Sequence, residues 1–473
     1  MGLGETVVAV GAGERPASFE QFSAAIDPAW IAEVLAATGT ASVRRRKLPA
    51  EHVVWLVIGM GLFHDRSIAQ VVQHLDLVLP ARNGGQGRVT NAAIVQARDQ
   101  LGAKPLAALF AQTAAVWATT AADATRWRGL AVYGLDGTTL RVADTPENVA
   151  HFGRPGSRHG EGAGYPQLRL VALSVLRHHL VAAATLGPYR TSEVPLAAGL
   201  WAVVPDRALV ILDRGFCSYV LFHALAEPAC QRHWLIRAKA GRTALKAHVV
   251  QRLGPGDHLV DLTASRGTRQ THRTLPATLR VRAVRVHHRG FRPYLVFTSL
   301  LDPVAYPAAE LVALYHERWE LELTFDEVKT HTLERTEALR SQAPTRVEQE
   351  VWGLLLAYNL LRLVMSRAAP RAAVPPLRLS YRHALLALRG FWHTAWLSPP
   401  GVLPRRLDAL LDELALFVLP ERRPRRYSRA VKIKMSTYPR KRPRRRRIRT
   451  NPDPKIIHAA SDRARQRKGP PLW

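Results

Sequence analysis

A run of five apolar residues, 208–212 (ALVIL), constrains the fold of this chain more than any other segment. The run stops at Asp213, the first charged residue after it. A short strand that is apolar at every position is buried on both faces, which is typical of central strands in parallel sheets. A predicted helix over residues 219–226 and a predicted strand over residues 234–238 would complete a βαβ unit. We therefore predict an α/β fold in which Asp213 lies at the carboxyl end of a central strand.

A second acidic residue follows another predicted strand. Residues 131–135 (AVYGL) lead into Asp136, and the residues around Gly137 predict a hairpin with its turn there. Two further strands are predicted between residues 168 and 186. Asp136 is therefore expected at a strand end, as Asp213 is.

Four polar residues with regular spacing follow these strands in the sequence. Intervals of three, four and seven residues separate Tyr315, Arg318, Glu322 and Lys329. Because an α-helix has about 3.6 residues per turn, these side chains would share one face of a predicted helix that begins near Pro307. A carboxylate on that face can bind a metal ion, while arginine and lysine can hold phosphates.

This spacing resembles the signature of a known family. It matches Y-x2-R-x3-E-x6-K, which marks bacterial insertion-sequence transposases of the insertion-sequence-four type, within the DDE transposase class. Asp136, in the sequence LDGT, and Asp213, in the sequence LDRGF, resemble the first and second acidic residues of that family. The signature selects Glu322 as the third acid. Competing acids on the predicted helix are Glu320, Asp326 and Glu327.

The resemblance implies an RNase H-like catalytic core, built on a mixed sheet, over residues 128–365. A β-rich insertion would precede the third acid, and the period-two alternation of residues 241–300 also predicts it. The core is expected to follow an all-helical N-terminal domain, residues 17–122, in which apolar residues recur at three- and four-residue steps. A C-terminal helical region, residues 366–420, and a basic, disordered tail, residues 421–473, would come after it.

The resemblance also implies a reaction. A transposase of this type binds the terminal inverted repeats of its insertion sequence, cleaves the DNA and transfers the cut strand to a target. Two Mg²⁺ ions, for which Mn²⁺ can substitute, would be held by Asp136, Asp213 and Glu322. The expected partner is double-stranded DNA, bound by a dimer, and no small-molecule substrate is expected.

Tyrosine and basic side chains are the candidate DNA contacts. The signature residues Tyr315, Arg318 and Lys329 would bind the DNA backbone, and Lys239 is a further candidate because it follows a predicted strand. A basic cluster precedes another predicted helix and consists of Arg44, Arg45, Arg46 and Lys47. Arg98 lies on a predicted helix whose small residues suit a major groove, although a polar surface helix explains this pattern equally well.

The charge balance supports a polyanionic partner. The chain carries 67 lysine and arginine residues against 37 acidic ones, a net charge of +30. Residues 421–473 hold 20 of the basic residues and only 3 of the acidic ones. Such a tail is predicted to neutralise phosphates without reading base sequence.

Two alternative functions share parts of this pattern. A DNA-binding protein derived from a transposase would use the basic residues without catalysis, and a metal-dependent nuclease would cut without strand transfer. No apolar stretch reaches the roughly 20 residues that a membrane span needs, and no secretory signal is evident. The expected location is the bacterial cytoplasm, on the nucleoid.

Overall fold

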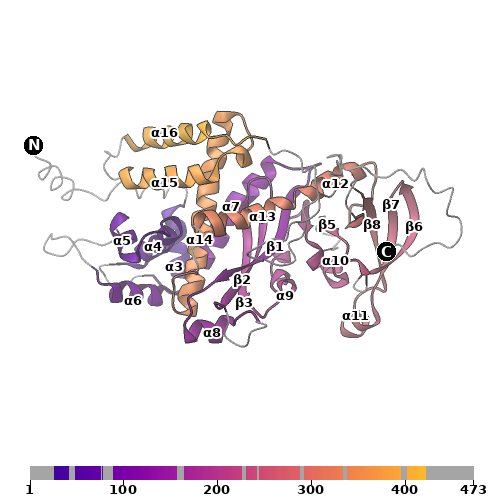
Figure 1. Cartoon of the computed structure of the whole chain (residues 1–473), viewed down its shortest axis with the longest axis horizontal. Coiled ribbons are helices and arrows are strands. Elements are labelled where there is room, and N and C mark those ends of the chain that lie inside the picture. Colours follow the sequence, from indigo (N-terminus) through magenta and orange to yellow (C-terminus); the bar gives the residue numbers. More distant parts are fainter. Residues whose placement is uncertain are drawn as a thin grey trace, which may run out of the picture. The chain divides into compact units, whose positions relative to one another are not determined.

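The structure is a computed structural model (Figure 1). It describes residues 26–41, 48–75, 77, 89–156, 164–225, 231–241, 244–287, 292–333, 338–395 and 402–421. These residues divide between two compact units. The first comprises the described parts of Met1–Ala124, Gly137–Leu200 and Leu321–Pro420, and the second those of Thr125–Asp136, Trp201–Glu320 and Glu421–Trp473. The units thus group the residues differently from the predicted domains, since the N-terminal helices share a unit with parts of the core.

Helices make up most of the first unit. They are α3 (Pro28–Ala37), α4 (Ala50–Leu62), α5 (Ile68–His74), α6 (Asn91–Leu101), α7 (Lys104–Ala124), α8 (Pro146–Phe152), α9 (Glu193–Ala198), α14 (Pro344–Ala368), α15 (Tyr381–Ala395) and α16 (Leu403–Leu416). The prediction of helices in the N-terminal region is confirmed for its described residues. Thr90 caps α6 as predicted, because its Oγ1 accepts a hydrogen bond from the backbone N–H of Ala93 at 3.3 Å.

Helix α14 lies at the centre of the first unit and packs directly against α4. All ten residues of α4 from Val53 to Leu62 are buried, which explains the apolar sequence of that helix. Two glycines permit the close approach of the helix backbones. A Cβ atom on Gly353 would lie 2.5 Å from the carbonyl oxygen of Val57, and one on Gly61 would lie 2.9 Å from the Cα of Leu354.

The first unit also contains the antiparallel strands β2 (Gln167–Val175) and β3 (Leu180–Pro188). Both strands were predicted, and their connection includes His179 with a positive φ of 59°. Helix α7 packs against β3, while α15 and α16 pack against each other as a helix pair (Figure 1). The predicted C-terminal helical region is therefore helical in its described residues.

The second unit is built on a mixed sheet with the strand order β1-β4-β5-β9-β8-β7-β6. These strands are β1 (Ala131–Arg141), β4 (Ala208–Leu212), β5 (Arg232–Arg237), β6 (Lys246–Gly254), β7 (Asp257–Thr263), β8 (Thr278–Val286) and β9 (Tyr294–Thr298). Strand β4 is buried at all five positions and runs parallel to both β1 and β5. Helix α10 (Tyr219–Leu225) connects β4 to β5, which confirms the predicted βαβ unit.

The predicted hairpin near Gly137 is wrong. Strand β1 continues without a turn from Ala131 to Arg141 and passes from the second unit to the first between Asp136 and Gly137. The glycine serves close packing instead, because a Cβ atom there would lie 2.5 Å from the Cδ of Glu193.

The predicted β-rich insertion is confirmed. Strands β6 to β9 are antiparallel neighbours, with the short helix α11 (Arg266–Thr271) between β7 and β8. A buried ion pair joins Arg282 of β8 to Asp257 of β7, and Arg282 also donates to the carbonyl of Tyr306 at 2.6 Å. These bonds fix the insertion to the segment that enters α12 (Ala308–His316). The fold is thus α/β with a mixed-sheet core and a β-rich insertion, as predicted.

The predicted basic tail lies outside the described residues beyond Glu421. Among the residues that are described, no helix is both long and apolar enough to cross a bilayer.

Candidate active site

Asp136 and Asp213 lie side by side in the sheet of the second unit. Leu135 of β1 pairs with Leu212 of β4 in parallel register, and each aspartate is the next residue of its chain segment. Because neighbouring strands lie about 4.8 Å apart, the two carboxylates emerge next to each other. Residues 214–216 form a 3₁₀ turn directly after Asp213, in which the Phe216 N–H donates to the Asp213 carbonyl at 3.0 Å. The continuous apolar run that stops at Asp213 therefore places this acid at the strand end.

Strand β5, the other neighbour of β4, places an arginine beside Asp213. Leu212 of β4 pairs with Ile236 of β5, so Arg237 occupies the register position beside Asp213. The guanidinium of Arg237 lies 4.5 Å from the centre of the Tyr294 ring, on β9. Neither residue was predicted to belong to the site. Arg237 lies within the strand predicted over residues 234–238, but that prediction gave Lys239, the residue after the strand, as the candidate.

Arg318 and Tyr315 approach the two aspartates within the second unit. Nη1 of Arg318 lies 4.0 Å from Oδ2 of Asp136, and their side chains are 17% and 20% exposed. Burial raises the pKa of Tyr315; the positive charge of Arg318 opposes this rise and the negative charge of Asp213 adds to it. Tyr315 therefore keeps its proton and is a hydrogen-bond donor close to Asp213. Its ring centre is 6.4 Å from that of Tyr294.

The prediction of one uninterrupted helix across the signature is wrong. Helix α12 ends at His316, and i to i−3 hydrogen bonds of the Glu317, Arg318 and Glu320 N–H groups form a tighter turn after it. Helix α13 (Trp319–Asp326) follows, and the π-helical turn η5 (Glu327–Thr332) continues from it. The directions of the signature side chains therefore depend on these two departures from α-helical geometry as well as on their spacing.

Glu322 and Lys329 belong to the first unit, where both are exposed. Nζ of Lys329 donates to Oγ1 of Thr138 at 3.3 Å. Partial desolvation lowers the pKa of Lys329, and the positive charge of Arg141 lowers it further. Thr138 is two residues beyond Asp136 on β1. Because side chains alternate along a strand, those of Thr138 and Asp136 leave β1 on the same side.

The three alternatives to Glu322 as the third acid, which are Glu320, Asp326 and Glu327, have different surroundings. Glu327 has a side chain that is 13% exposed, and it pairs with Arg362 and His179. Asp326 accepts a hydrogen bond from Thr330 at 2.6 Å. Glu320 belongs to the second unit and precedes the first-unit part of α13 by one residue.

Asp136 and Asp213 fit a divalent metal ion chemically. Carboxylate oxygens are the ligands that Mg²⁺ prefers. Asp213 directly follows the end of β4, whereas Asp136 lies within β1, one residue past its pairing with β4, so the prediction that Asp136 ends a strand is wrong. Within the described ranges, no three His, Cys, Asp or Glu side chains form a metal-binding group. The aspartate pair is thus the part of the predicted metal site that the structure brings together.

The structure places the predicted DNA contacts outside the signature in different surroundings. Arg98 is only 2% exposed and donates from Nε to Gln349 at 2.7 Å, so its assignment as a DNA contact is wrong. Lys239 is half-buried beyond the end of β5 and lies close to the Cys217 thiol. The basic cluster Arg44, Arg45, Arg46 and Lys47 lies outside the described residues.

Comparisons with known proteins find matches over most of the chain. Residues 16–111 match the family model "Insertion element 4 transposase N-terminal", and residues 127–360 match the family model "Transposase DDE domain". The chain is 36% identical over 416 residues to transposase InsG for insertion sequence element IS4 of Escherichia coli (strain K12), covering 88% of this chain and 92% of that protein. It is 34% identical over 223 residues to InsZ of the same strain, covering 47% of this chain and 73% of InsZ.

One solved structure is also similar in part. The piggyBac transposase in a synaptic complex with hairpin DNA, solved by cryo-electron microscopy, matches with a TM-score of 0.40 and 10% identity. The match covers 87% of each chain.

Proposed function

Because this chain belongs to the insertion-element-4 family of DDE transposases, we propose that it binds the terminal inverted repeats of an insertion sequence, cuts the DNA there and joins the ends to a target. The observation that carries this proposal is the pair Asp136 and Asp213, which directly follow the last paired residues of the neighbouring strands β1 and β4, with Arg318 beside Asp136. Two adjacent carboxylates are the usual core of a site that holds metal ions for phosphodiester chemistry.

We propose that Asp136, Asp213 and Glu322 hold two Mg²⁺ ions, for which Mn²⁺ can substitute. When bound, such ions stabilise the charge that develops on the attacking and leaving oxygens of an in-line displacement. The attacking group would be water in the cutting step and a DNA 3′-hydroxyl in the joining step.

The remaining signature residues would orient the DNA. Arg318 lies against Asp136, which keeps its guanidinium at the site where a phosphate would bind. The protonated Tyr315 can donate to a phosphate oxygen, and Lys329 supplies a positive charge near Thr138. Lys239 and the basic cluster of residues 44–47 are further proposed DNA contacts. We also propose that a dimer pairs the two DNA ends, in the bacterial cytoplasm on the nucleoid.

To test this function, a labelled duplex that carries the repeats flanking the gene is incubated with the protein, Mg²⁺ and a target plasmid, and the fate of both duplex ends is measured. A transposase yields duplex that is cut at the repeat boundary and joined to the plasmid. A nuclease yields cut duplex without joined product, and a DNA-binding protein yields only a shifted, intact duplex.

Truncation after Pro420 should weaken DNA binding for all sequences and reduce its salt dependence. The deleted residues 421–473 carry 20 basic and 3 acidic side chains. For every phosphate that the shortened chain no longer neutralises, the slope of log K against log salt concentration should become shallower by about 0.9. Binding titrations at several salt concentrations, with repeat DNA and with shuffled DNA, measure this slope. An unchanged slope, or weaker binding confined to repeat DNA, would contradict the proposed role of the tail.

A further inference from the structure

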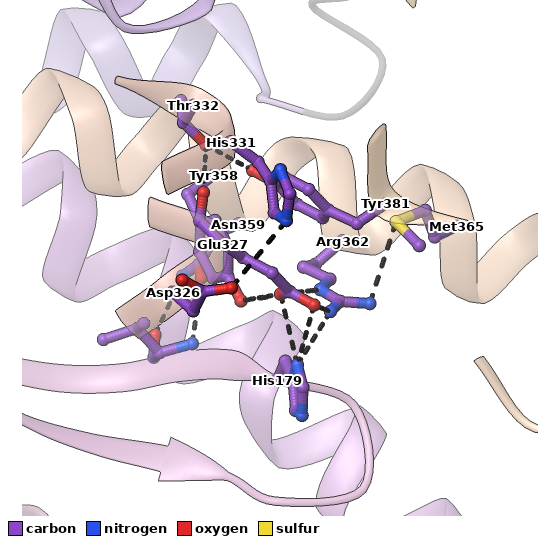
Figure 2. Close-up of polar contacts among 11 residues, drawn as sticks. His179, Asp326, Glu327, His331, Thr332, Tyr358, Asn359, Arg362, Met365 and Tyr381 are labelled. Atoms are coloured by element: carbon purple, nitrogen blue, oxygen red, sulfur yellow. Dashed lines mark hydrogen bonds and ion pairs between the residues drawn. The ribbon is translucent and has the colours of Figure 1, made fainter. Parts of the chain in front are cut away.

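The first unit contains a buried cluster of charged and polar side chains outside the candidate active site (Figure 2). Figure 2 shows the carboxylate of Glu327 facing the guanidinium of Arg362, with His179 next to both. Nε of Arg362 donates to Oε2 of Glu327 at 3.1 Å, and its Nη2 pairs with Oε1. Tyr358 donates its hydroxyl to Oε2 at 2.8 Å, and Nδ1 of His179 lies 3.1 Å from the same oxygen. The side chains of Arg362 and His179 are at most 2% exposed, so the charges are paired away from water.

This cluster holds the π-helical turn at both of its ends. Glu327 is the first residue of η5, and Arg362 fixes it to α14. Thr332 is the last residue, and its Oγ1 lies 2.6 Å from the hydroxyl of Tyr381 on α15. The guanidinium of Arg362 also lies 5.1 Å from the centre of the Tyr381 ring, which connects the two ends.

A π-helical turn depends on contacts with other elements, such as those at the two ends of η5. Turns with i to i−5 hydrogen bonds, such as that from the Leu333 N–H to the Val328 carbonyl, are rare and occur frequently at functional sites. The extra residue in the turn changes the direction of every side chain that follows its start, compared with a continuing α-helix. Lys329 is the third residue of η5, and its ammonium reaches Thr138 in this geometry.

We propose that Glu327 and Arg362 are positioning residues that act through Lys329: their buried ion pair holds η5 in π-helical geometry and thereby places the Lys329 ammonium beside β1. This inference rests on the proposed function, because it assigns to Lys329 a role in holding DNA for cutting. Glu327 therefore affects the reaction without contacting DNA or metal.

A double-mutant cycle tests this role. Glu327→Gln keeps the size of the side chain and removes its charge. The rate of cutting is measured for Glu327→Gln in the native chain and again in a Lys329→Ala background. Since small misplacements of a positioning group cost up to about 100-fold, we expect a loss of about 10- to 100-fold in the native chain. In the Lys329→Ala background the same substitution should change the rate less than about 3-fold, because the group that it positions is absent.

A matched control separates positioning from general stability. Glu350 on α14 is also buried, and it accepts hydrogen bonds from the backbone N–H groups of Arg340 and Ser341. Glu350→Gln should change the rate by the same factor in both backgrounds. If Glu327→Gln fails to fold, Tyr381→Phe replaces it, since that variant removes only the hydroxyl that holds Thr332.

The outcomes distinguish the two proposals. A native chain that never cuts repeat DNA would overturn the proposed function. If the native chain cuts, but Glu327→Gln or Tyr381→Phe changes the cutting rate by the same factor in the native and Lys329→Ala chains, only the positioning role is overturned. A Lys329→Ala variant that cuts at the native rate would overturn it as well.

Discussion

Asp136→Asn and Asp213→Asn should each lower the rate of DNA cutting at least about 1,000-fold, since metal ions stabilise the developing charge by several kcal/mol and each 1.36 kcal/mol is tenfold. Asparagine has nearly the same volume as aspartate and preserves the strand, but its neutral amide is a poor ligand for Mg²⁺. Glu322→Gln should have the same effect. Binding of repeat DNA should stay nearly unchanged, because metal binding and groove contacts are separate functions. Gel analysis of cut products and of band shifts measures both quantities.

The matched control for these substitutions is Asp206→Asn. Asp206 precedes β4, belongs to the same unit as Asp213 and has a side chain that is 65% exposed. Its substitution should leave both cutting and binding at native levels. Native cutting by Asp213→Asn, or an equal loss of DNA binding in all three acid variants, would refute the assignment of the acids.

Arg362→Ala should lower the free energy of unfolding of the first unit by about 3–5 kcal/mol, because it removes the arginine that neutralises the largely shielded Glu327 carboxylate and leaves only His179 and Tyr358 beside it. Burial acts to raise the pKa of Glu327, but the charges and hydrogen bonds of Arg362 and His179 outweigh it and hold the pKa at about 2. Such a lowered pKa contributes stability above the ordinary carboxyl pKa of about 4.3, and this stability is lost as the pH falls toward 2. The stability difference between native protein and variant should therefore be largest near neutral pH and shrink below pH about 4.

Urea denaturation at neutral and acidic pH measures this difference. Arg371→Ala is the control, because Arg371 pairs with Asp408 and Asp412 at the surface of the same unit. Exposed pairs of this kind contribute little to stability, because water and salt screen the attraction between the two charges. An Arg362→Ala variant as stable as Arg371→Ala, or a stability difference independent of pH, would contradict the account of the cluster.

The predictable parts of the fold have strong local signals. Residues 208–212 form a strand because five consecutive apolar side chains suit burial on both faces, and the same signal places Asp213 at its end. The position of Asp136 beside it then follows from parallel pairing, although the sequence around Gly137 wrongly indicated a turn. That error arose because a glycine required for packing has the same sequence signal as a glycine required for a turn.

Partners that are distant in the sequence explain most of the other errors. Arg98 was predicted to contact DNA because the small residues of its helix suit a major groove, yet it is buried and binds Gln349, 251 residues away. The π-helical turn depends on Arg362 and Tyr381 in later helices, so spacing alone could not show that α-helical geometry ends at Asp326. Arg237 was missed because the strand predicted over residues 234–238 runs one residue further than β5, which made Lys239 the candidate in place of Arg237.

The fate of the cut 3′ end tests the central claim most directly. The native protein is incubated with a duplex labelled at the end of one terminal repeat, a target plasmid and Mg²⁺, with EDTA replacing Mg²⁺ in a parallel reaction. We predict cutting at the repeat boundary and transfer of the label to the plasmid with Mg²⁺, and an intact, bound duplex with EDTA. An intact duplex in both reactions, with tight binding to the repeat, would contradict the claim that Asp136 and Asp213 form a working catalytic site.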